Sequence, residues 1–186
     1  MTAPWQGLLP TSLEVGGAVY AIRSDYRAAL DICTALSDPE LAGRERAAVL
    51  LEILYPDIDE MPPEHYEEAV EQGLRFIRGG AEEPPGKAPR LVDWEQDFPY
   101  IVAPINRVTG QEIRALEHMH WWTFLSAYYE IGDCTFAQIV RIRDRLARGK
   151  TLDKPDREWY QKNRQLVDFK RKYTEQEEAA LGQWLR

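Results

Sequence analysis

Two histidines near the middle of the chain, His118 and His120, are the side chains whose type best matches a metal site. Imidazole nitrogens are common zinc ligands, but the ligands of one ion must converge on it. Within a helix, side chains two positions apart point about 200° away from each other, so the two rings diverge. The third histidine, His65, is far away in the sequence, and no further ligand follows zinc spacing. We therefore predict no metal site: one histidine caps or borders a helix, and the other forms a hydrogen bond at the edge of the core.

Patterns typical of catalysis are missing from the sequence. It contains no glycine-rich phosphate loop, no Gly-x-Ser-x-Gly turn and no His-Glu-x-x-His pair. The acidic pair Glu67-Glu68 and the acidic run 57–60 are typical of a solvated face. Cys134 precedes a predicted helix, where a thiolate is stabilised, but no histidine lies near it in the sequence to act as a base. We interpret Cys134 as a buried structural thiol and predict that the protein is no enzyme, with no catalytic residues and no cofactor.

The densest aromatic segment, 117–129, is predicted to form the central helix of the fold. Trp121, Phe124, Leu125 and Tyr128 follow the spacing i, i+3, i+4 and i+7, which is one face of a helix. Trp122 flanks this face, so the apolar arc is wide enough to be contacted from more than one side. We predict a core built from six aromatic residues, namely Trp94, Phe98, Trp121, Trp122, Phe124 and Tyr128.

The other elements indicate a mainly α fold, a bundle of about seven helices with one short N-terminal β-hairpin. Two alternating runs within residues 11–22 flank Gly16-Gly17, and glycine adopts the positive φ that a tight hairpin turn demands. Helical spacing and capping residues then predict helices that begin after Asp25 and that cover about 43–55, 62–78, 94–108, 136–146 and 156–172. Ala47, Leu50, Leu51 and Leu54 form the apolar face of the second helix, and Tyr66, Ala69, Val70, Gly73, Leu74 and Ile77 that of the third; Phe136, Ile139, Val140 and Arg143 face inward from a later one.

Two further details concern the ends and interruptions of these helices. Pro99 and Pro104 fall inside 94–108, and an interior proline costs about 3 kcal/mol, so we expect that helix to be kinked or broken. Asp133 is the predicted cap of the helix from Phe136. A Thr-x-x-Glu capping box at Thr174 opens a predicted terminal helix, 174–186.

A single domain, 1–186, fits the length of the chain. Residues 81–90 contain three prolines and no large apolar residue, which predicts an exposed loop within that domain. We predict that partners bind at two places: the terminal helix, through Leu181, Trp184 and Leu185, and the hairpin around Gly16 and Gly17. Both carry apolar residues that a compact domain does not need.

Charge is distributed unevenly along the chain. The net charge is −8, made up of −13 over residues 1–140, +7 over 141–172 and −2 over 173–186. A basic segment in an acidic protein pairs with its own body, pairs with a neighbouring copy or binds nucleic acid. The basic residues interleave with Asp and Glu, which favours pairing within the chain or between copies. The sequence has only two cysteines, which predicts reduced thiols. It has no signal sequence and no apolar run long enough to cross a membrane, so we expect a cytoplasmic protein.

The order of these motifs resembles the bacteriophage gene-product-fifteen family over residues 9–173. The opening Leu9-Pro10-Thr11-Ser12-Leu13-Glu14-Val15-Gly16-Gly17 is similar to the family's leucine-proline entry and hairpin, and Arg23-Ser24-Asp25-Tyr26-Arg27 to the block that follows. Further matches are Leu51-Glu52-Ile53-Leu54-Tyr55-Pro56, Val92-Asp93-Trp94-Glu95-Gln96-Asp97-Phe98-Pro99-Tyr100-Ile101 and His120-Trp121-Trp122-Thr123-Phe124. The prolines at 99 and 104 depart from the usual pattern.

This resemblance implies a small protein of long-tailed phages or prophages, resident in the cytoplasm of the bacterial host. It implies a tail assembly chaperone, which coats the long tape-measure protein until tail-tube subunits replace it, and it carries over no catalytic residues. One alternative is a structural virion component, such as a head–tail connector or tail-completion protein. A second is a nucleic-acid-binding regulator that uses residues 141–172. Expected partners are the tape-measure protein, other tail proteins and further copies of this chain.

Overall fold

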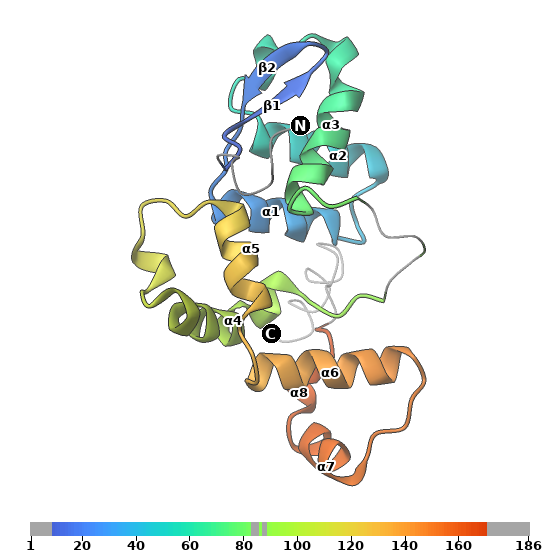
Figure 1. The fold of residues 1–186 in the computed structure, drawn as a ribbon. Coiled ribbons are helices and arrows are strands. Elements are labelled where there is room, and N and C mark those ends of the chain that lie inside the picture. Colours follow the sequence, from blue (N-terminus) through green and yellow to red (C-terminus); the bar gives the residue numbers. More distant parts are fainter. Residues whose placement is uncertain (1–8, 83–85, 87–88, 171–186) are drawn as a thin grey trace, which may run out of the picture.

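The computed structural model of the protein describes residues 9–82, 86 and 89–170. Within these residues it contains eight α-helices and one two-stranded sheet (Figure 1), so the predicted mainly α fold with an N-terminal hairpin is confirmed. The hairpin and the first three helices lie at one end, α4 and α5 lie in the middle, and α6 to α8 lie at the other end. In chain order the elements are β1 Ser12–Val15, β2 Ala18–Ala21, α1 Tyr26–Leu36, α2 Gly43–Leu54, α3 Tyr66–Ile77, α4 Trp94–Thr109, α5 Trp121–Tyr129, α6 Thr135–Ala147, α7 Lys154–Lys162 and α8 Arg164–Val167. Three short 3₁₀ helices, η2 Ile58–Glu60, η3 Pro63–His65 and η4 Ile113–Ala115, lie between them.

The hairpin forms where the sequence predicts it. β1 and β2 are antiparallel, with Leu13 opposite Tyr20 and Val15 opposite Ala18. The turn consists of Gly16 and Gly17, whose φ angles of 57° and 76° are those that only glycine adopts without strain. The two-residue loop therefore fixes the register of the strands.

Helix α4 runs without interruption through Pro99 and Pro104, so of the predicted kink or break the break does not occur. Each proline removes only one backbone donor, and both ends of the helix are well capped. The Asp93 carboxylate accepts a hydrogen bond from the Gln96 N–H, and Gly110 closes the C-terminus with φ 72°. Burial of Ile101, Val102 and Ile105 on one face stabilises the helix further.

Helix α5 begins at Trp121 and not at residue 117, because the residues before it pair with the start of α1. The Trp121 N–H donates to the Ser24 carbonyl at 2.7 Å, and the Tyr26 N–H donates to the Met119 carbonyl at 2.9 Å. The Asp25 carboxylate also accepts from the Met119 N–H. These hydrogen bonds between distant parts of the chain hold residues 118–120 beside the start of α1 and leave them outside the helix.

The C-terminal part differs from the prediction in two ways. Cys134, and not Asp133, caps α6, since its Sγ accepts from the Ala137 N–H at 3.4 Å. The helix predicted over 156–172 is two short helices, α7 and α8. Asn163 separates them: its φ of −125° and ψ of 27° lie outside the helical range, so α7 ends there and α8 begins at the next residue.

Buried apolar residues gather in two clusters. The larger extends from the hairpin to Phe136, with Trp121, Phe124, Tyr26 and Phe76 among its largest members. The smaller consists of Ile139, Ile142, Leu152 and Val167, which join α6 to the loop before α7 and to α8. Of the predicted loop 81–90, the described residues 81, 82, 86, 89 and 90 are all exposed. None of the described helices is both long and apolar enough to cross a membrane.

Candidate interaction surfaces

The two histidines of the suspected metal motif have separate hydrogen-bonding roles. His120 is the N-cap of α5: its Nδ1 accepts from the Trp122 N–H at 3.0 Å, and its Nε2 bonds to the Pro10 carbonyl at 2.9 Å. Both ring nitrogens are therefore occupied, with the hydrogen on Nε2. His118 is exposed and lies 3.3 Å from the Ser24 hydroxyl. The predicted divergence of the two rings assumed that both histidines lie within the helix, but both precede it. No group of three potential metal ligands occurs among the described residues.

The Trp121-Trp122 pair fastens α5 to the end of α3. The two indole N–H groups donate to the carbonyls of Ile77 and Phe76, each at 2.9 Å. These carbonyls lie in the last turn of α3, where the helix ends, and the Phe76 carbonyl also accepts from the Gly79 N–H at 3.0 Å. The first residues of α5 thus donate hydrogen bonds to carbonyl groups at the end of α3.

The predicted aromatic core divides into buried and half-buried members. Trp121 and Phe124 are buried, and their rings stack at 5.4 Å. The other four residues are half-buried and pack against the same cluster: Trp94, Phe98, Trp122 and Tyr128. Burial raises the pKa of Tyr128 to about 12. The two buried members therefore support the fold, and the other four keep part of their surface exposed.

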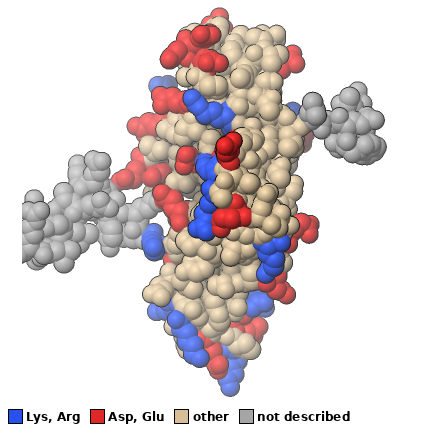
Figure 2. All heavy atoms as spheres, turned by 90° about the vertical axis from the view of Figure 1, so that its left-hand side faces the viewer, with Lys and Arg blue, Asp and Glu red and all other residues tan. Residues whose placement is uncertain are grey.

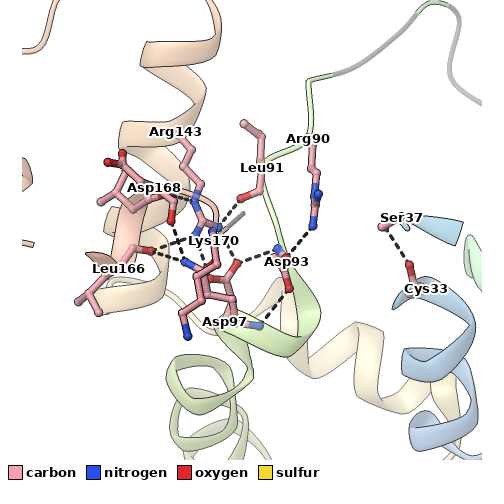
Figure 3. A network of polar contacts seen from close by, with 12 residues as sticks. Cys33, Ser37, Arg90, Leu91, Asp93, Asp97, Arg143, Leu166, Asp168 and Lys170 are labelled. Atoms are coloured by element: carbon pink, nitrogen blue, oxygen red, sulfur yellow. Dashed lines mark hydrogen bonds and ion pairs between the residues drawn. The ribbon is translucent and has the colours of Figure 1, made fainter. Parts of the chain in front are cut away.

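A buried polar network joins the basic segment to the rest of the protein (Figure 3). The Arg143 guanidinium on α6 meets the Asp97 carboxylate on α4 at 2.6 Å and 3.0 Å. Arg143 also donates to the carbonyls of Leu91, Leu166 and Val167, so one side chain holds α8 and the segment before α4 together. Most other arginines of this segment pair within it, as in Arg141 with Asp156 and Arg148 with Asp144.

The hairpin, one of the two predicted partner sites, is fixed on the body at its inner face. The Gly16 N–H donates to the Glu68 carboxylate at 3.0 Å, and the Tyr20 hydroxyl bonds to His65 Nδ1 at 2.8 Å. Gly16 and Gly17 themselves are exposed. On the outer face, Val19 is 71% exposed and lies opposite Glu14. The outer face of the hairpin therefore offers a partner one large apolar side chain, that of Val19.

The second predicted partner site cannot be compared with the structure. Leu181, Trp184 and Leu185, with the whole predicted helix 174–186, lie outside the described residues.

An open groove between α2 and α3 was not predicted as a site. Helix α2 lines it with residues at helical spacing, Arg44, Ala47, Ala48, Leu51 and Glu52, and α3 contributes Tyr66, Glu67 and Val70. Ile58 and Asp59 of η2 close one side, and the volume is about 870 Å³. The floor is apolar and the rim is charged. At Gly73 the two helices approach so closely that an added Cβ would lie 2.7 Å from a methyl group of Leu50.

Sequence periodicity identifies part of this groove. Ala47, Leu51, Tyr66 and Val70 belong to the predicted apolar faces, which were assigned to the core. Ala48 and Ile58 were missed, because neither belongs to those faces. The sequence does give one signal for Ala48: it is apolar and lies next to the apolar face of α2. An apolar face of that width is more than one neighbouring helix covers.

The rim of the groove belongs to a strongly acidic end of the molecule. Residues 57–71 hold seven Asp and Glu and no Lys or Arg, and all seven carboxylates are exposed. Figure 2 shows acidic side chains at the end that carries the hairpin, whereas Lys and Arg are interleaved with Asp and Glu toward the end that carries α6 to α8. The hairpin end is therefore acidic, and the opposite end is mixed with an excess of cations.

Comparison with known proteins places this chain in a phage family. The model of a family described as Bacteriophage Gp15 protein matches residues 6–169. Searches of curated proteins and of solved structures returned no match. The match covers most of the chain, including the hairpin, the groove and the double-tryptophan helix. The chain therefore belongs to the Bacteriophage Gp15 protein family, and its function is that of a phage structural or assembly-related protein.

Proposed function

We propose that this protein is a tail assembly chaperone-like protein that binds the tape-measure protein in the cytoplasm of the bacterial host. The observation that carries the proposal is the open apolar groove between α2 and α3 in a member of a phage family. A chaperone for a long protein needs exposed apolar surface, and it needs no catalytic site. The role is accordingly a binding role and not an enzymatic one.

The groove suits an amphipathic helix laid along it. Its floor consists of small and medium side chains, among them Ala47, Ala48 and Val70, which leave room for a partner's Leu or Ile. Such helix-in-groove binding uses two or three apolar anchors one turn apart. Each anchor contributes roughly 1.5–3 kcal/mol when it is fully buried.

The expected affinity of one groove is low. Association costs about 4–15 kcal/mol in lost translational and rotational freedom, which is as large as or larger than the roughly 3–9 kcal/mol that two or three anchors contribute. Several copies along one long partner gain by avidity, because each bound copy needs only a weak contact. Weak individual contacts also allow tail-tube subunits to displace the protein later, which a tight complex would prevent.

The experiment is co-purification of the tape-measure protein of the same phage with tagged variants of this chain. Ala48→Glu places a charged side chain on the groove floor, whereas Ala103→Glu makes the same change at an exposed alanine of α4, outside the groove. We expect the wild type and Ala103→Glu to retain the tape-measure protein and Ala48→Glu to lose most of it. Equal retention by all three would exclude the groove as the binding site.

A structural virion component is the competing assignment. Such a component would be present in purified particles at a fixed copy number, whereas a chaperone is absent from them. Mass spectrometry of purified virions distinguishes the two.

A further inference from the structure

The acidic end of the molecule finds no counterion for its charge among the described residues. The seven carboxylates of residues 57–71, which we name the acidic pole, form no ion pair with any described Lys or Arg. Among these carboxylates, only that of Glu68 accepts a hydrogen bond within the described residues, from the Gly16 N–H. Seven like charges within fifteen residues repel one another, so a cationic partner bound at this end lowers the electrostatic energy.

The opposite end has cations in excess. Residues 141–164, which we name the basic pole, hold nine Lys and Arg against four Asp and Glu. Arg141, Arg145 and Arg148 are paired with aspartates of the same segment. Three exposed lysines, Lys150, Lys154 and Lys162, form no ion pair within the described residues.

The basic pole also has a shape that accepts a side chain. A hollow of about 540 Å³ lies beside α6, lined by Arg141, Arg145, Lys150 and Thr151, with Asp144 and Gly149. Cationic groups outnumber the single carboxylate in its wall. A carboxylate that projects from another molecule fits such a hollow by charge.

We propose that copies of this chain associate head to tail, with the acidic pole of one copy on the basic pole of the next. The two poles lie at opposite ends of the molecule, so one copy cannot bring its own poles together (Figure 1). A contact between two different patches is heterologous and leaves one free pole at each end. The product is an open row of copies, and this inference does not depend on the identity of any tail partner.

Net charge does not prevent this contact. The protein carries −8 overall, but exposed charges are screened beyond about 8–10 Å at physiological ionic strength. Opposite charges in direct contact therefore outweigh the repulsion between distant parts of two copies. The same reasoning makes the association weak and dependent on salt.

The test is sedimentation velocity at about 0.05 M and 0.5 M salt, since screening lengths differ several-fold between these conditions. The acidic-pole variant carries Glu60→Lys, Glu64→Lys and Glu71→Lys, and the basic-pole variant carries Lys150→Glu, Lys154→Glu and Lys162→Glu. A control with the net charge of the acidic-pole variant carries Glu40→Lys, Glu117→Lys and Glu130→Lys, all exposed and outside the pole. Circular dichroism and the melting temperature confirm that each variant is folded.

We expect the wild type and the control to associate at low salt and to become monomeric at high salt. Each pole variant alone stays monomeric, because three substitutions bring the charge of its altered pole from −7 or +5 to −1. An equal mixture of the two associates in pairs, because each variant keeps the pole that the other has lost. A wild type that is monomeric at low salt, or pole variants that associate alone as the wild type does, would overturn the proposal. Binding of duplex DNA by a wild type that remains monomeric would instead assign the basic pole to nucleic acid.

Discussion

The carboxylate of Asp97 and the guanidinium of Arg143 form a two-pronged ion pair from which water is almost excluded. The two contacts measure 2.6 Å and 3.0 Å, and the side chains are 0% and 3% exposed. Asp97 also accepts from the Asp93 N–H, at the start of the same helix. Every strong partner of the pair is thus internal, so the pair fixes how α6 and α8 sit on α4.

Arg143→Met should destabilise the protein by about 3–5 kcal/mol, because it leaves the Asp97 charge buried without its counterion. Urea unfolding at pH 7 measures the loss. Replacing both partners, as in Arg143→Met with Asp97→Leu, should recover part of that loss, since no unpaired charge then remains.

Arg148→Met is the matched control for this prediction. Arg148 pairs with Asp144 one turn away on the same helix, and both are solvent-accessible. Such a pair contributes about 0.3–0.5 kcal/mol. Equal losses from Arg143→Met and Arg148→Met would contradict the structural role of the buried pair.

Trp121→Ala and Phe124→Ala should each cost about 3–5 kcal/mol, as large buried aromatics do when truncated. Trp121→Ala additionally leaves the Ile77 carbonyl without its donor. Tyr129→Ala on the same helix, where the ring is 73% exposed, should change stability by less than about 0.5 kcal/mol. Thermal melts of the three variants decide the matter: unchanged melting for the first two would mean that this face of α5 is open to partners.

Gly16→Ala should destabilise the hairpin more than Gly17→Ala does. Both positions have positive φ, so both substitutions introduce backbone strain. An alanine Cβ at position 16 would lie 2.2 Å from His65 Nε2, whereas nothing lies within 4 Å of one at position 17. The difference in unfolding free energy should be about 1–3 kcal/mol, and it should shrink when His65→Ala removes the ring. An equal loss at both glycines would place the cost in the backbone alone.

Cys33 should react slowly with iodoacetamide in the folded protein. Burial raises the pKa of its thiol to about 12, so at pH 8 roughly one molecule in ten thousand carries the reactive thiolate. In a Cys134→Ser background, mass spectrometry should find Cys33 largely unmodified in buffer and fully modified in urea. Rapid modification in buffer would show that the thiol is accessible.

The same pKa shift gives a dependence of stability on pH. The folded thiol holds its proton above pH 9, where the unfolded thiol releases it. The contribution to stability is therefore complete below pH 9 and declines as the pH rises toward 12.

The features that could be predicted from the sequence are those determined by residues close to one another in the sequence. The Gly16-Gly17 turn specifies the hairpin, Asp25 and Asp93 cap the helices that follow them, and the spacing of Trp121 and Phe124 identifies a buried face. Each of these depends on residues within one or two helical turns.

The errors arise where distant residues decide the outcome. Helix α5 starts late because residues 118–120 bond to Ser24, Asp25 and Tyr26, which lie more than ninety positions earlier. Arg143 was expected to face inward, yet its partner Asp97, 46 positions away, gives no local signal. The α2–α3 groove depends on the placement of two helices side by side, so periodicity could identify its walls and not the opening between them.

The most direct test of the proposed chaperone role is the soluble fraction of the tape-measure protein expressed with and without this chain. We predict a several-fold larger soluble fraction with the wild-type chain and with Ala103→Glu, little gain with Ala48→Glu, and no copies of this protein in purified virions. An equal soluble fraction in all cultures, together with a fixed number of copies in the virion, would contradict the chaperone role and identify a structural component of the particle.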